Sequence, residues 1–177
     1  MFALRFWLIC LAAFMLFPSG YAQRRREVLN PLEVDQLRDA AQEPETRLKL
    51  YVEFARLRLV NLEKVRADAK AKDRGQQTHD GLDEFLTIYN ELNDNVDNFA
   101  DRKDDLRKPL KLIIEADTEF QSKLLAIRDA ANVTKQEASE YEFVLRDSLE
   151  TVDDSIEDHR KMLAEQEEAA KNKKKRR

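Results

Sequence analysis

Apolar side chains recur at the three- and four-residue spacing of an α-helix over most of this chain after residue 30. Comparable stripes cover residues 48–62, 106–131 and 145–163, and no segment alternates apolar and polar residues as a β-strand does. The pattern therefore predicts an all-α fold. The most regular stripe consists of Leu82, Phe85, Tyr89, Leu92, Val96 and Phe99.

Helix-start signals divide the chain into one short helix and several long ones. Asn30, a proline and then Glu33 are typical of a capped helix start, and Pro44 opens a second helix soon afterwards. Thr134 and Glu137 form the pattern of a capping box at the start of the last helix. Because short connections make sequential helices neighbours, the sequence predicts an antiparallel up-and-down bundle over residues 30–170.

Two interpretations are open for the segment before Pro109. The stripe of the third predicted helix passes through Lys103 into the next stripe without a phase slip, which is typical of one long helix. However, a proline costs about 3 kcal/mol in a helix interior, and the charged segment Asp101–Lys108 suits an exposed corner. We therefore favour a turn, which gives four long helices plus a short N-terminal one, over a single long helix kinked at Pro109.

Antiparallel pairing about the expected turns also predicts which residues face each other. The turn before the third helix is expected at residues 73–75, and the turn before the last helix near residue 133. The second turn places Asp117 opposite Thr151 and His159 opposite the region of Pro109.

The first 22 residues have the features of a secretory signal peptide. Arg5 precedes an unbroken apolar run over residues 6–17, and Gly20 and Ala22 are small residues at the expected cleavage site. As a helix the apolar run rises only about 18 Å, against about 30 Å of bilayer hydrocarbon, so a membrane anchor is not expected. We predict cleavage near Ala22 and a mature protein that is periplasmic or extracellular and has no transmembrane span.

Chemistry-bearing motifs are absent from the predicted mature chain. Cleavage would remove Cys10, the one cysteine of the chain, which excludes redox and cysteine-nucleophile chemistry. No Glu-x-x-His pair is present for a di-iron site, and no Ser, His and Asp stand in a recognisable catalytic context. We therefore expect no enzymatic activity, no cofactor and no bound metal.

Two polar residues occupy positions on otherwise apolar stripes. A buried carboxylate at Asp117 would mark a ligand or proton site; alternatively the stripe shifts to Ala116 and leaves Asp117 at the edge of the core. His159 is a candidate metal ligand or pH switch, or else a buried imidazole held by a hydrogen bond.

Basic residues gather at both ends of the predicted mature chain, and all 35 acidic residues lie between them. We expect a basic arm at 23–29 and a basic tail at 171–177, both disordered by self-repulsion. Two interpretations are open: these ends contact an anionic lipid or an envelope polyanion, or they only neutralise the acidic body. The candidate contact residues are Arg24, Arg25, Arg26, Lys171, Lys173, Lys174, Lys175, Arg176 and Arg177.

The sequence favours a non-catalytic exported bundle that binds a protein partner, or itself, through an apolar helix face. The basis is the wide apolar arc of the helix predicted over 44–72, where Leu50, Phe54, Leu57 and Val65 form a second stripe. The alternatives are a protein that binds a polyanion or membrane surface through its basic ends, and a periplasmic holdase-type chaperone. No nucleic-acid partner is expected.

Overall fold

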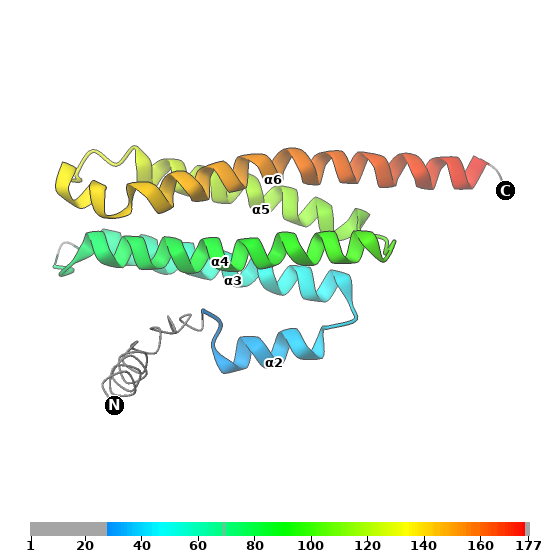
Figure 1. Cartoon of the computed structure of the whole chain (residues 1–177), viewed down its shortest axis with the longest axis horizontal. Coiled ribbons are helices and arrows are strands. Elements are labelled where there is room, and N and C mark those ends of the chain that lie inside the picture. The colour runs from blue at the N-terminus through cyan, green and yellow to red at the C-terminus, as the bar shows by residue number, and fades with distance from the viewer. Residues whose placement is uncertain (1–27, 69, 176–177) are drawn as a thin grey trace, which may run out of the picture.

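The computed structural model describes residues 28–68 and 70–175, and all regular secondary structure in these two ranges is helical (Figure 1). The predicted all-α bundle of four long helices and a short N-terminal one is therefore confirmed. The predicted signal peptide at 1–22 and nearly all of the predicted arm at 23–29 lie outside the described residues. The helices are α2 (Pro31–Asp39), α3 (Pro44–Ala67), α4 (Arg74–Asp101), α5 (Arg107–Arg128) and α6 (Lys135–Lys175).

The four long helices run alternately in opposite directions, but α4 and α5 are not neighbours. Helix α3 packs beside α4 and α5, and α6 packs beside the same two, so α4 and α5 occupy diagonal corners of the bundle. The sequence prediction that all sequential helices are neighbours is wrong here, because residues 102–106 are long enough to cross the diagonal. Five residues reach up to about 17 Å, and the diagonal between helices packed about 9 Å apart is about 13 Å.

The diagonal crossing makes α3 and α5 parallel neighbours, and α4 and α6 likewise. Three ion pairs link α3 to α5, and their partners are 60 to 63 residues apart, as expected for helices that run in the same direction. Such pairs at the surface contribute at most about 1 kcal/mol each, so they report the alignment more than they create it. The pairs are Arg56 with Glu119, Lys123 with Glu63, and Lys108 with Glu45.

The segment before Pro109 is a turn and not a kink. Helix α4 ends at Asp101 and α5 begins at Arg107, which confirms the favoured interpretation. Pro109 is the third residue of α5, where an α-helix has no internal partner for the backbone N–H that proline lacks. The proline is therefore compatible with the helix that it begins.

Side chains of α4 and α5 meet in the middle of the core although their backbones are apart. The rings of Phe85 and Tyr89 on α4 contact the ring of Phe120 on α5 edge to face, with centroids 5.4 and 6.0 Å apart. All three side chains are fully buried. Tyr89 also belongs to the polar cluster described below.

The turn between α3 and α4 differs from its prediction. Helix α3 ends at Ala67, before the expected end near Lys72, and α4 begins at Arg74. Gly75, expected in the turn, therefore lies in the first turn of α4. A Cβ atom on Gly75 would lie 2.0 Å from a carboxylate oxygen of Glu140 on α6, so the glycine allows a close approach between α4 and α6.

Helix α6 continues to Lys175, where the sequence predicted a disordered tail over 171–177. Lysine has good helix propensity, and ammonium groups interact favourably with the free carbonyls at a helix C-terminus. These two effects favour helix over the self-repulsion of the lysines. Arg176 and Arg177 lie outside the described residues.

The end of α4 supplies a stability prediction. Lys103 has a left-handed backbone with φ of 65°, and its N–H donates to the Ala100 carbonyl at 2.8 Å. Because glycine adopts this conformation without a Cβ clash, Lys103→Gly should raise the free energy of unfolding by about 0.5–1 kcal/mol. Urea denaturation followed by circular dichroism measures the change. The control Lys111→Gly, inside α5, should lower it by about 1 kcal/mol; a loss at position 103 as well would contradict the prediction.

Candidate functional site

A polar cluster lies in the middle of the core, where Tyr89 of α4, Asp117 of α5 and His159 of α6 meet. Tyr89 Oη donates a hydrogen bond to Asp117 Oδ1 at 2.8 Å, and His159 Nδ1 lies 2.9 Å from Asp117 Oδ2. Tyr89 and Asp117 are 0% exposed and His159 is 3% exposed. The cluster therefore joins three of the four long helices through one buried carboxylate.

The protonation of the cluster follows from its hydrogen bonds. Burial raises the pKa of the Tyr89 phenol far above its usual value, and the neighbouring Asp117 carboxylate raises it further. Tyr89 therefore stays protonated and donates a hydrogen bond to Asp117. Two polar atoms 2.9 Å apart need a hydrogen between them. The hydrogen bond between His159 Nδ1 and Asp117 Oδ2 orients the imidazole ring.

A second polar contact links α4 and α6 beside the cluster. Asn93, one helical turn after Tyr89, donates from Nδ2 to Ser155 Oγ at 2.8 Å. Ser155, one turn before His159, in turn donates to the backbone carbonyl of Thr151 at 2.7 Å. Asn93 and Ser155 thus add a second polar link between α4 and α6, in which Asn93 Oδ1 is buried without a hydrogen-bond partner.

The structure brings together the two polar residues that the sequence singled out. The predicted register, which placed Asp117 opposite Thr151 and His159 opposite Pro109, is wrong, and so is the alternative that Asp117 lies at the edge of the core. The physical reason lies at the start of α6. Its first turn, at Glu137, packs on the beginning of α4, so α6 meets α5 later along the sequence than a tight hairpin would allow.

Sequence reasoning missed Tyr89 as the third member of the cluster, because Tyr89 fits its apolar stripe. The signal was its hydroxyl: a buried tyrosine needs a hydrogen-bond partner, and Asp117 was the one carboxylate on a facing stripe. The resulting carboxylate–imidazole contact is of a kind found in acid–base catalysis, but a reacting molecule must reach the atoms that exchange protons. Here these atoms are enclosed by the core, so the geometry supports a structural role.

An ion pair with little solvent exposure ties α2 to α3. Arg58 Nη1 and Nη2 donate to the two carboxylate oxygens of Glu33 at 2.7 and 2.6 Å, and Nη2 also donates to the Val28 carbonyl at 2.8 Å. Burial favours the neutral form of Glu33, but the hydrogen bonds from Arg58 and from the backbone N–H of Asn30 outweigh burial and hold its pKa below the usual value. The sequence predicted the helix-start role of Glu33 but not this ion pair.

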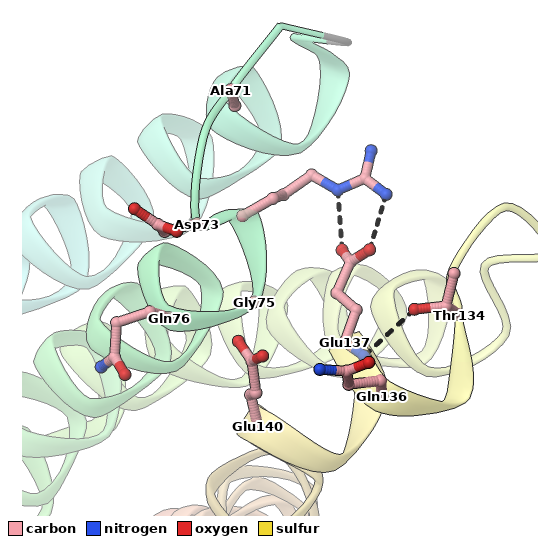
Figure 2. A pocket seen from close by; sticks show the side chains of 9 residues that line it. Ala71, Asp73, Gly75, Gln76, Thr134, Gln136, Glu137 and Glu140 are labelled. Atoms are coloured by element: carbon pink, nitrogen blue, oxygen red, sulfur yellow. Dashed lines mark hydrogen bonds and ion pairs between the residues drawn. The ribbon is translucent and has the colours of Figure 1, made fainter.

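A hollow opens at the end of the bundle where α4 and α6 begin (Figure 2). Beside it, Arg74 donates through Nε and Nη2 to the two carboxylate oxygens of Glu137, each at 2.7 Å. The other charged residues of the lining are Asp73 and Glu140. Because Glu137 engages the arginine on both oxygens, the hollow offers an anion little attraction, and the pair acts as a clamp between the two helices.

The predicted basic contact residues are divided between described and undescribed parts of the chain. Lys171, Lys173, Lys174 and Lys175 are exposed on the last turns of α6. The remaining five lie outside the described residues: Arg24, Arg25, Arg26, Arg176 and Arg177.

The described residues contain neither a group of metal-binding side chains nor a helix that could span a membrane. Within residues 28–68 and 70–175, no three or more His, Cys, Asp or Glu side chains are grouped so that they could hold a metal ion. None of the helices in these ranges combines the length and the apolar character needed to cross a bilayer. Comparisons of the chain with protein-family models, curated proteins and solved structures found no match.

Removing the central carboxylate should destabilise the bundle strongly. Asp117→Ala leaves the Tyr89 hydroxyl and the His159 imidazole without their partner in the core, and should lower the free energy of unfolding by about 3–5 kcal/mol. Tyr89→Phe keeps the ring contacts but removes one hydrogen bond to the carboxylate, and should cost less, about 1.5–3 kcal/mol. The measurement is urea denaturation, with Asp158→Ala, an exposed carboxylate on α6, as the control that should change stability by at most about 0.5 kcal/mol. A loss below 1 kcal/mol for Asp117→Ala would contradict the role given to the cluster.

The Glu33–Arg58 pair predicts a pH dependence. Because folding lowers the pKa of Glu33, its contribution to stability is complete above the ordinary value of 4.5 and is lost as the pH falls through the lower folded-state pKa. The stability difference between the native chain and Glu33→Gln should therefore be constant from pH 7 to about pH 5 and shrink below about pH 4. Urea denaturation at each pH measures it. Asp35→Asn, an exposed carboxylate on α2, is the control; an equal pH dependence for both variants would contradict the assignment.

Proposed function

We propose that this protein is a non-catalytic, exported helical bundle that works by macromolecular contact, and that the basic C-terminal end of α6 binds an anionic surface of the cell envelope. The single observation that carries the proposal is the projection of α6 beyond the other helices (Figure 1). Export rests on the predicted signal peptide at 1–22, and the absence of catalysis on the enclosure of the one acid–base-like cluster.

The projecting part of α6 begins where its contacts with the bundle end. Gln166 accepts a hydrogen bond from the backbone N–H of Leu106 at 2.8 Å, and Glu167 pairs with Lys111 at 2.9 Å. Helix α6 then continues to Lys175, and this projection, residues 168–175, carries four exposed lysines and one glutamate. A helical projection presents these charges away from the acidic body of the protein.

The chemistry of the projection favours surface contact without insertion. Each lysine near an anionic surface contributes about 1 kcal/mol, an attraction that salt weakens. After Leu163 the helix has no large apolar side chain, whereas helices that insert into a membrane interface carry bulky apolar residues on one face. The expected contact is therefore electrostatic and reversible.

The other two proposals gain less from the structure. In the second apolar stripe of α3, Phe54 is buried, Leu50 and Val65 are half-buried, and Leu57 is exposed, so the stripe offers a partner little free apolar surface. The exposed large apolar residues among those described are divided among α2, α3 and α6, whereas a holdase needs a concave apolar surface. They are Leu32, Val34, Leu57 and Phe143.

The test neutralises the lysines of the projection without shortening the helix. A variant with Lys171, Lys173, Lys174 and Lys175 each changed to Gln should bind vesicles of equal parts phosphatidylglycerol and phosphatidylcholine about 1,000-fold more weakly than the native chain at low salt. Vesicle co-sedimentation measures binding, and raising the salt should abolish the binding of the native chain.

A matched control separates the position of the charges from the net charge. The control variant changes Lys49, Lys64, Lys108 and Lys161 to Gln; these lysines are exposed elsewhere on the bundle, and the change in net charge is the same. This variant should retain most of the binding. An equal loss in both variants, or no loss in the α6 variant, would reject the proposal.

A further inference from the structure

Helix α2 is attached to the bundle through one neighbour. Among the described helices its backbone packs against α3 only, and in Figure 1 it lies to one side of the four long helices. Residues 40–43 connect the two helices, so α2 folds back onto the helix that follows it. The backbone of α2 therefore lies against α3, and Arg58 of α3, which holds Glu33, also pairs with Glu84 of α4 at 3.7 Å.

The face of α3 that α2 covers is called the seat below and consists of Arg47, Tyr51, Phe54 and Arg58. It matches α2 in both charge and shape. Glu33 is 4% exposed and receives two hydrogen bonds from Arg58, and three turns away Arg47 donates to the Leu37 carbonyl. Arg47 and Arg58 lie on one face of α3, and the helical period places Tyr51 and Phe54 on the same face between them. This face of α3 binds a short helix that presents a carboxylate and, four residues later, a leucine.

An exposed apolar patch lies beside this seat. Helices α2 and α3 are antiparallel, because Glu33 meets Arg58 and the later Leu37 meets the earlier Arg47. In an antiparallel pair, the residues immediately before two facing residues lie on the same side of the pair. These residues are Leu32, which is 68% exposed, and Leu57, which is 44% exposed. A neighbouring molecule at this position would remove both side chains from water.

We propose that α2 is an exchangeable docking helix, and that its partner is a second copy of this chain. In the exchanged dimer, α2 of each copy occupies the α3 seat of the other, with residues 40–43 as the hinge. All contacts that α2 makes with α3 are retained, and the new contact between copies covers Leu32 and Leu57. The charge complementarity of Glu33 and Arg58 makes the seat selective for α2.

A pair of charge reversals tests the exchange. In Glu33→Arg the seat holds two arginines beside Glu84 of α4, and in Arg58→Glu it holds two glutamates beside Glu84, so closure of α2 within one chain is weakened in both variants. When the two variants are mixed, partly unfolded in urea and refolded, each α2 finds its complement on the other chain. Size-exclusion chromatography with light scattering should then show a one-to-one complex of twice the monomer mass, and each variant alone should stay at the monomer mass.

The double variant Glu33→Arg with Arg58→Glu is the control, because it restores the pair within one chain and should remain as monomeric in dilute solution as the native chain. If a single variant is unfolded alone, recovery of its helical circular dichroism on mixing supports the exchange. A mixture that stays at the monomer mass, or that recovers no helix when a variant is unfolded, would overturn the proposal.

Discussion

The structure depends on a carboxylate placed where water cannot reach it. Asp117 is stabilised in the core because Tyr89 and His159 satisfy both of its oxygens, and these partners come from two other helices. A shift of α6 by one turn, or a rotation of α4, would leave a buried charge without a partner, at a cost of several kcal/mol. The apolar stripes alone tolerate such shifts, since one leucine can replace another. The polar cluster thus selects one alignment among several that bury similar apolar area.

The helices themselves were predictable from the sequence because their signals are local. Spacing of apolar residues, the cap at Asn30 and the position of Pro109 each act within a few residues, and each prediction agrees with the structure. Register and neighbour order were not predictable, since both depend on how far a short connection reaches in space. The contact between the starts of α4 and α6 includes the ion pair of Arg74 and Glu137, whose partners are 63 residues apart.

The candidate sites were likewise predictable only in their local features. Asp117 and His159 could be singled out because each interrupts an apolar stripe. Their contact could not be predicted, because the register expected for α5 and α6 placed them opposite other residues. The Glu33–Arg58 pair could not be found, because both residues look like ordinary surface charges on helices of their own. For the basic tail, the sequence gives the charge, whereas the projection of α6 that presents it depends on where α3, α4 and α5 end.

The diagonal path of residues 102–106 also determines the electrical character of the two ends of the molecule. In a bundle whose sequential helices are neighbours, amide ends and carbonyl ends would alternate around each rim. Here the amide ends of α4 and α6 lie together, opposite the carbonyl ends of α3 and α5, so the partial charges of the helix macrodipoles divide this rim into a positive and a negative half. Glu137 lies on the positive half, and Arg66 and Arg128 on the negative one. One short connection therefore governs a polarity that charged residues of α3, α5 and α6 then counterbalance.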